Sequence, residues 1–192
     1  MKDLVKRLFD ILGALAGLVL LSPFIVGTAL AVRIFIGSPV FFRQKRPGLN
    51  GKPFEMIKFR TMTDARGAEG SLLPDADRLT PLGRFLRASS LDELPELMNI
   101  LRGEMSFVGP RPERPQFVDM LSQEIRYYDV RHCMKPGLTG WAQLRYPYGA
   151  SVEDAAEKLT FDLFYVKNHG LMFDLMILLQ TVEVVLFRRG AR

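Results

Sequence analysis

The chain has 192 residues, of which 48% are hydrophobic and 24% are charged, and its formal net charge is +5. This length allows one globular domain and a membrane segment. The single cysteine, Cys133, excludes a disulfide framework and a cysteine zinc cluster, and two histidines make histidine-based metal or triad chemistry unexpected. No nucleic-acid-binding motif is present, so no nucleic acid partner is expected. The basic balance instead favours an anionic membrane surface or phosphate-bearing substrates.

The N-terminal hydrophobic segment, residues 8–36, carries no charge between Asp10 and Arg33. It is long enough to cross a bilayer as a helix, which takes about 20 residues. Ser22 and Pro23 interrupt its middle. A proline removes a backbone N–H and its ring crowds the carbonyl four residues earlier. Such a carbonyl must find another donor in lipid, and the Ser22 hydroxyl can supply one.

Basic residues flank this segment on both sides. Positive charge favours the cytoplasmic side of a membrane, so a helix that enters, bends at Ser22-Pro23 and returns to the same face is preferred over a straight span. A signal peptide fits poorly because no small-x-small cleavage site is present. A buried core helix would be unusually apolar on all sides. The flanking residues are Lys2, Lys6, Arg7, Arg33, Arg43, Lys45 and Arg46.

Short β-prone segments follow within residues 39–58, on either side of Asn50-Gly51. Asn-Gly is a strong signal for a tight turn, so a β-hairpin is expected there. Residues 63–77 are polar and glycine-rich and are expected to form a loop.

Two helices are expected after this loop. Thr80-Pro81 is typical of a helix start, with proline at the first helical position, and Ser89-Ser90 ends this first, short helix. The second helix carries leucines at helical spacing and closes at Gly103. Because Pro95 is tolerated only among the first, unpaired N–H groups, the second helix is predicted to begin near Asp92.

That start places Asp92 and Glu93 together at a helix N-terminus, with Glu96 one turn later and off the leucine stripe. Acids there have a structural explanation, because aspartate caps helices and acidic side chains complement the helix dipole. The alternative is a pair of carboxylates that performs chemistry. The next segment bears on the choice, since Arg111 lies between two prolines in a non-helical linker, residues 103–112. This linker is either an exposed turn or a preorganised phosphate clamp.

Three further helices are expected, over residues 113–128, 152–168 and 171–187. Residues 136–141 are expected to form a loop whose glycines permit close backbone approach to a ligand. The last helix is strongly apolar but carries acids, so it is expected to lie in the membrane interface or against the core rather than span the membrane. Trp141 has three explanations, namely stacking on a base or sugar, anchoring at the interface, or simple packing.

Together these elements predict a mainly α fold with a small β-hairpin (α+β). Residues 1–36 are expected to form a re-entrant membrane helix-break-helix, and residues 37–192 a cytosolic, membrane-apposed globular domain with interfacial amphipathic helices. Two carboxylates with a hard cation and arginines suit phosphoryl transfer. A hydrophobic anchor suits a lipid-linked substrate.

Six motifs occur in order along the chain: Ser22-Pro23, Phe42-Arg43-Gln44-x-Arg46-Pro47-Gly48, Lys58-Phe59-Arg60-Thr61-Met62, Ser90-Leu91-Asp92-Glu93-Leu94-Pro95, Met105-Ser106-x-Val108-Gly109-Pro110-Arg111-Pro112 and Pro136-Gly137-Leu138-Thr139-Gly140. With these motifs the chain resembles the bacterial sugar transferase family, the monotopic phosphoglycosyl transferases, over nearly its whole length. It is similar to the minimal catalytic form, without the N-terminal four-helix membrane bundle of longer relatives.

The resemblance implies an enzyme of the bacterial inner membrane, with its catalytic domain on the cytoplasmic face. Such an enzyme transfers a sugar-1-phosphate from a UDP-sugar to polyprenyl (undecaprenyl) phosphate and releases UMP. It implies Mg²⁺, held by Asp92 and Glu93, and a covalent phosphosugar intermediate on Asp92. Ser22 and Pro23 are implied to form the re-entrant break. The residues expected to bind substrate phosphates are Arg87, Arg111, Lys58 and Arg60.

Two other functions stay open at this point. One is a membrane-bound nucleotide-sugar pyrophosphatase with water as the acceptor. The other is a non-enzymatic membrane-surface scaffold that uses the basic loop after Arg33. A homo-oligomer is compatible with either function and with the transferase.

Overall fold

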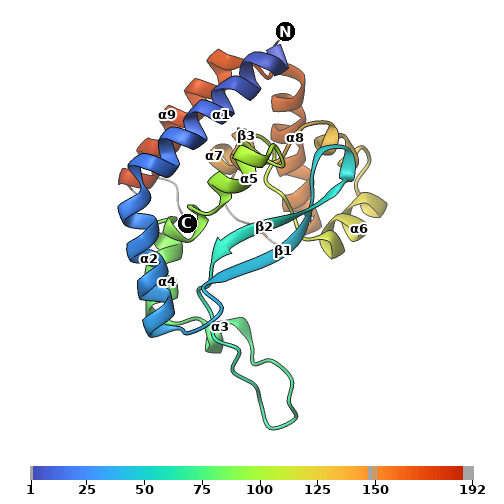
Figure 1. The fold of residues 1–192 in the computed structure, drawn as a ribbon. Coiled ribbons are helices and arrows are strands. Elements are labelled where there is room, and N and C mark those ends of the chain that lie inside the picture. Colours follow the sequence, from blue (N-terminus) through green and yellow to red (C-terminus); the bar gives the residue numbers. More distant parts are fainter. Residues whose placement is uncertain (1, 147–148, 150, 188–192) are drawn as a thin grey trace.

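The computed structural model describes residues 2–146, 149 and 151–187. In these residues the chain is mainly helical with two small two-stranded sheets, which confirms the expected α+β class (Figure 1). The helices and strands are α1 Lys2–Leu20, α2 Ser22–Phe35, β1 Phe41–Pro47, β2 Pro53–Phe59, α3 Asp75–Arg78, α4 Pro81–Ala88, α5 Glu96–Arg102, β3 Ser106–Val108, α6 Pro115–Glu124, β4 Gly137–Thr139, α7 Trp141–Arg145, α8 Val152–Asn168 and α9 Leu171–Phe187. Short 3-10 helices are η1 Leu49–Gly51, η2 Leu91–Glu93 and η3 Tyr128–Cys133.

The predicted break in the N-terminal segment is present between α1 and α2, which meet at an angle of 63°. Pro23 has no N–H for the Val19 carbonyl, and Ser22 Oγ donates to that carbonyl instead, at 2.7 Å. Among the described helices, none is long and apolar enough to cross a membrane alone. The bent pair α1–α2 meets the length and composition requirements when the two helices are taken together.

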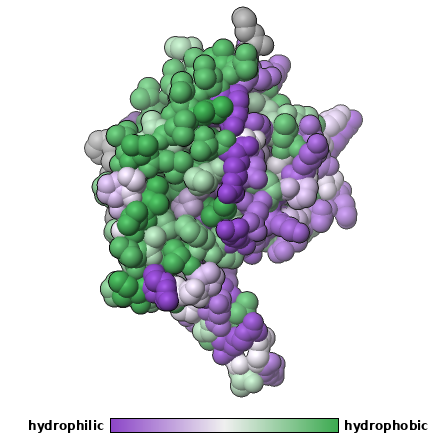
Figure 2. Space-filling model, viewed as in Figure 1, coloured by the Kyte–Doolittle hydropathy of each residue, from purple (hydrophilic) through white to green (hydrophobic). Residues whose placement is uncertain are grey.

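Exposed apolar side chains are concentrated on α1 and α2. Figure 2 shows hydrophobic residues gathered over the side of the molecule where these two helices lie in Figure 1. A contiguous apolar surface of this kind marks contact with a membrane or another protein. The exposed residues include Leu8, Leu12, Val19, Leu20, Phe24, Leu30, Ile34 and Phe35, with Met172 and Leu179 on α9.

The expected hairpin is formed by β1 and β2, which pair antiparallel from Phe41 opposite Phe59 to Pro47 opposite Pro53. Its connection requires positive φ angles, which are 55° at Asn50 and 73° at Gly51. These residue types adopt such angles at low cost, which explains why Asn-Gly predicted the turn correctly.

A second sheet was not expected. β3 and β4 pair in parallel, so both the predicted linker at residues 103–112 and the predicted loop at residues 136–141 contain a strand. The loop also gives way to α7 at Trp141. The two backbones lie very close together beyond β3, because a Cβ on Gly137 would lie 2.1 Å from the backbone nitrogen of Gly109. Only glycine permits that approach.

Several predicted helix boundaries are wrong. The helix expected to begin near Asp92 begins at Glu96, because Leu91–Glu93 forms a separate 3-10 turn and Pro95 occupies the cap position. The helix expected over residues 113–128 is confined to Pro115–Glu124. The loop expected over residues 63–77 ends in α3. In contrast, α8 and α9 have the predicted bounds.

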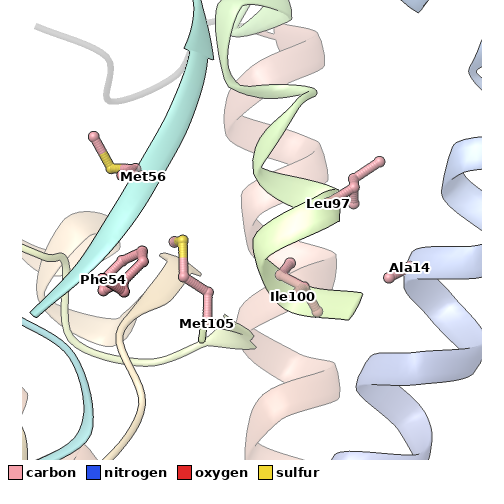
Figure 3. Close-up of a cluster of buried hydrophobic side chains, with 6 residues drawn as sticks. All are labelled: Ala14, Phe54, Met56, Leu97, Ile100 and Met105. Atoms are coloured by element: carbon pink, nitrogen blue, oxygen red, sulfur yellow. The ribbon is translucent and has the colours of Figure 1, made fainter. Parts of the chain in front are cut away.

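One cluster of the core joins elements that are distant in sequence. α1, β2, α5 and the residue just before β3 contribute one buried cluster, which Figure 3 shows in close-up. Its members are Ala14, Phe54, Met56, Leu97, Ile100 and Met105. α1 thus packs against the body of the protein, and the proposed domain division after residue 36 stays a prediction.

Buried polar contacts also attach α1 to this body. Asp10 is 2% exposed and accepts hydrogen bonds from Ser106 Oγ and the Phe107 backbone N–H, both at 3.0 Å. Lys6 Nζ pairs with Asp174 of α9 at 2.6 Å. Lys6 was interpreted above only as a signal of membrane topology, and the structure gives it a second role in holding α1 against α9.

Candidate active site

The acidic pair lies on the short turn η2, between the end of α4 and the start of α5. Ser90, the residue before η2, has a φ of 55°, a left-handed conformation that turns the chain sharply after α4. Asp92 is 8% exposed. From the neighbouring strand β2, Lys58 Nζ reaches Glu93 at 2.5 Å and Glu96 at 3.1 Å. The strand and the helix therefore place the carboxyl groups of Glu93 and Glu96 on one ammonium group, with Asp92 close enough to feel its charge.

Glu93 is held between two cations. Its Oε1 accepts hydrogen bonds from Lys58 Nζ at 2.5 Å and from Arg111 Nη2 at 3.0 Å. Burial opposes ionisation of Glu93, but the charges of Arg111 and Lys58 outweigh burial and lower its pKa to about 2. In return, Glu93 raises the pKa of Arg111. At neutral pH Glu93 is a fixed anion that orients both cations.

Asp92 has a different environment. Burial and then the negative charge of Glu93 raise its pKa, while Lys58 and Arg87 act in the opposite direction. Within the part of the chain that the structure describes, Asp92 forms no salt bridge. Arg87 of α4 faces this region, and its Nε donates to Thr61 Oγ1 at 3.2 Å. Asp92 is thus a buried carboxyl group near cations but not held by one, which suits a nucleophile.

Glu96 was not predicted to face the site. It is 3% exposed in the first turn of α5, and burial raises its pKa to about 7 although Lys58 opposes the rise. One signal for it exists in the sequence. Residues 92, 93 and 96 are acids within five positions, and residues three or four apart lie on one side of a helical turn.

Within the described residues, Arg60 forms no ion pair with Asp92, Glu93 or Glu96, and its partner is Asp64. The buried Arg60 side chain also donates to the backbone carbonyls of Met62 and Ser38, both at 2.8 Å. These contacts hold together the chain segments around the end of β2. The basic residues that the structure brings to the acidic pair are Lys58, Arg87 and Arg111.

The two carboxylates on this turn fit a magnesium ion that takes few of its ligands from the protein. Mg²⁺ takes oxygen ligands, and in phosphoryl-transfer sites it often uses one or two carboxylates with water and substrate phosphates. Among the described residues, no group of three or more His, Cys, Asp and Glu side chains is placed to hold a metal ion. Asp92 and Glu93 are adjacent carboxylates, so they fit an ion whose remaining ligands come from the substrate and from water.

Trp141 packs within an aromatic cluster. Its ring centroid lies 5.2 Å from that of Phe173 and 6.4 Å from that of Phe164, and the Arg145 guanidinium lies 4.1 Å from the indole centroid. Of the three explanations given above, the structure supports packing.

Comparison with known proteins agrees with the motifs. A family model described as bacterial sugar transferase matches residues 1–188. A protein named "Uncharacterized sugar transferase EpsL" from Bacillus subtilis (strain 168) is 46% identical over 187 residues, which cover 97% of this chain and 90% of that protein.

Two further relatives carry names that describe a reaction. The UDP-glucose:undecaprenyl-phosphate glucose-1-phosphate transferase of Caulobacter vibrioides is 41% identical, and the match covers 96% of this chain and 70% of that protein. The UDP-N-acetylgalactosamine-undecaprenyl-phosphate N-acetylgalactosaminephosphotransferase of Aeromonas hydrophila is 38% identical, and the match covers 98% of this chain. This chain spans 45% of the length of the Aeromonas protein.

Proposed function

The chain belongs to the bacterial sugar transferase family, and on this premise we propose that it transfers a sugar-1-phosphate from a UDP-sugar to undecaprenyl phosphate. The names of the Caulobacter and Aeromonas relatives support the substrate classes. The observation that carries the proposal is the contrast within the acidic pair. Glu93 is tied to two cations, whereas the adjacent Asp92 is buried and forms no salt bridge with a described residue.

In the first half-reaction, a carboxylate oxygen of Asp92 attacks the phosphorus atom that carries the sugar. The bond from this phosphorus to the bridging oxygen breaks, and UMP leaves with that oxygen and its electron pair. Asp92 then carries the phosphosugar as an acyl phosphate. Covalent catalysis of this kind divides one difficult transfer into two easier steps.

In the second half-reaction, a phosphate oxygen of undecaprenyl phosphate attacks the same phosphorus. The bond between phosphorus and the Asp92 oxygen breaks, which restores the carboxylate and releases a sugar linked to the lipid by a diphosphate. Glu93, with its pKa lowered to about 2, stays anionic through both steps. It therefore keeps Lys58 and Arg111 oriented while the substrate changes.

The surrounding cations neutralise the charge that moves between the phosphate groups. Arg111 and Arg87 lie near opposite members of the acidic pair, Arg111 at Glu93 and Arg87 at Asp92. Preorganised guanidinium groups stabilise developing charge because they need no reorientation during the reaction. A Mg²⁺ ion bound by Asp92 and Glu93 would supply further neutralisation of the phosphate oxygens.

We further propose that α1 and α2 form a re-entrant anchor in the inner membrane and place the site at its cytoplasmic face. The bend of 63°, the apolar outer residues and the basic flanks support this arrangement. A shallow anchor brings Asp92 to the depth of the lipid headgroups, where the phosphate of the acceptor lies.

The proposal is tested by UMP release from a UDP-sugar in the presence and absence of undecaprenyl phosphate. We expect continuous release only with the lipid, and about one UMP per enzyme without it. Asp92→Asn should abolish both, because the amide is a far weaker nucleophile. Continuous release without the lipid would indicate a pyrophosphatase instead. A biological role that survives replacement of both Asp92 and Glu93 would indicate a scaffold.

A further inference from the structure

The turn that carries Arg111 is fixed through its backbone at successive residues. The backbone of each residue from 109 to 112 forms a hydrogen bond with a different partner. The four bonds are Gly109 N–H to Thr139 O at 2.9 Å, Gly137 N–H to Pro110 O at 3.0 Å, Arg131 Nη2 to Arg111 O at 2.9 Å and Arg46 Nη1 to Pro112 O at 3.1 Å. Two of the donors are arginine side chains from elements distant in sequence, η3 and β1.

Arg131 is the more deeply buried of these two arginines. It is 6% exposed, and its Nη2 also pairs with Asp162 of α8 at 2.8 Å. Its Nη1 donates to the Tyr128 hydroxyl at 2.8 Å. Asp162 is 3% exposed, so both charges of this pair lie inside the protein.

A purely stabilising role explains this pair poorly. Removing two charges from water is expensive, and apolar residues of similar size at such positions are often as stabilising or more so. The hydrogen bond from Arg131 to the Arg111 carbonyl gives the buried pair a different role. A charged donor fixes the direction of that carbonyl, which an apolar side chain could not do.

We propose that Arg131 is a positioning residue that acts through Arg111, so that the Asp162–Arg131 pair sets the affinity of the site for the diphosphate of the nucleotide donor. The inference rests on the proposed function. Arg111 has a long side chain that is 45% exposed, and within the described residues its guanidinium pairs with Glu93 at 3.0 Å. With its backbone fixed, the guanidinium loses less freedom when it binds phosphate oxygens.

Direct measurement of UDP binding by calorimetry, with the full chain in lipid nanodiscs, tests this role without requiring turnover. The main variant is Arg131→Met with Asp162→Leu, which removes both charges together and avoids leaving one buried charge unpaired. We expect the dissociation constant for UDP to rise by up to roughly 10-fold, the scale of the freedom lost when one long side chain is immobilised on binding. Arg131→Lys, which keeps the charge but cannot bridge three acceptors, should lose affinity in the same way and serves if the double variant does not fold.

The decisive comparison repeats the double variant in an Arg111→Ala background. If Arg131 acts through Arg111, the additional change has no further effect on UDP affinity. Losses that simply multiply would overturn the proposal, as would wild-type affinity in the folded double variant. Removing an exposed ion pair of the hairpin, by Arg43→Gln with Glu55→Gln, controls for the loss of an ion pair in general and should leave UDP affinity unchanged.

Turnover supplies a second readout that a merely structural role would not move selectively. The KM for the UDP-sugar should rise in the double variant, while the KM for undecaprenyl phosphate stays at the wild-type value. An equal rise in both would overturn the positioning role. Failure of the wild-type protein to bind UDP at all would overturn the proposed function, and this inference with it.

Discussion

At the scale of single residues, Lys58 organises the ionisation of the acids around it. It lies within 3.1 Å of both Glu93 and Glu96, yet their pKa values move in opposite directions, to about 2 and about 7. The difference arises because Glu93 has Arg111 as a second cation, whereas burial dominates at Glu96, whose ion pair within the described residues is with Lys58. One lysine cannot compensate the burial of both carboxyl groups.

This difference predicts a pH dependence of stability that belongs to Glu96. Its pKa rises from 4.5 to about 7 on folding, so the folded state binds the proton more tightly and becomes less stable as pH increases between these values. Glu96→Gln should remove this decline, which can reach about 1.4 kcal/mol per pH unit. Urea unfolding at a series of pH values from 4.5 to 7 measures it.

The matched control is Glu69→Gln, which changes an exposed acid of the loop. Its stability should keep the pH dependence of the wild type. The same decline in Glu96→Gln as in the wild type would contradict the assignment.

The sequence predicted the acidic pair and the proline-flanked arginine because their chemistry is visible in adjacent residues. It did not assign Glu96 to the site, because the sequence does not show that Lys58 of β2 lies against the first turn of α5. The phosphate-binding role expected of Arg60 stays a prediction. The structure places that guanidinium on the carbonyls of Met62 and Ser38, contacts that depend on the folded path of the chain.

At the scale of elements, α1 serves both as part of the apolar surface and as part of the core. One side carries exposed leucines, and the other is attached to β3 through Asp10. Charged residues beside an apolar segment predict membrane topology. The sequence pattern does not reveal which of these charged residues become buried in the folded protein. The parallel pairing of β3 with β4 escaped prediction for a related reason, since each strand has three residues and lies about 30 positions from its partner.

Asp10→Ala tests the attachment of α1. Loss of the carboxylate leaves the Phe107 backbone N–H without its acceptor, which should cost about 1–3 kcal/mol of unfolding free energy. Chemical denaturation in detergent micelles measures this cost. Asp3→Ala, at an exposed position of the same helix, is the control and should have little effect. Equal losses in the two variants would argue that α1 is held only by apolar packing.

The break between α1 and α2 predicts the topology of the anchor. Cysteines introduced by Asp3→Cys and Lys45→Cys, with the exposed Cys133 changed to serine, should be labelled from the same side of sealed vesicles. Replacing Ser22 and Pro23 with alanine restores a donor for the Val19 carbonyl and should allow a continuous helix.

In that alanine variant, we expect the two cysteines to be labelled from opposite sides. Labelling from opposite sides in the protein with Ser22-Pro23 intact would show a complete span and refute the re-entrant arrangement. The single-cysteine proteins without the alanine changes serve as references for accessibility.

At the scale of the whole molecule, the anchor and the acidic turn belong to one packed body. The cluster around Ala14, Leu97 and Ile100 joins α1 directly to α5, the helix that follows Asp92 and Glu93. A hydrophobic surface and a cationic, carboxylate-lined site are therefore held at a fixed separation. This arrangement suits a reaction in which one substrate is dissolved in water and the other is anchored in lipid.

The central claim is that Asp92 forms a covalent bond to the phosphosugar. Intact-mass spectrometry of the purified protein, incubated with a UDP-sugar but without undecaprenyl phosphate, measures this most directly. We expect a mass increase of one phosphosugar, mapped to the peptide that contains Asp92, absent from Asp92→Asn and removed when the lipid phosphate is added. Turnover by a competent preparation without any adduct, or an adduct that persists in Asp92→Asn, would contradict the account.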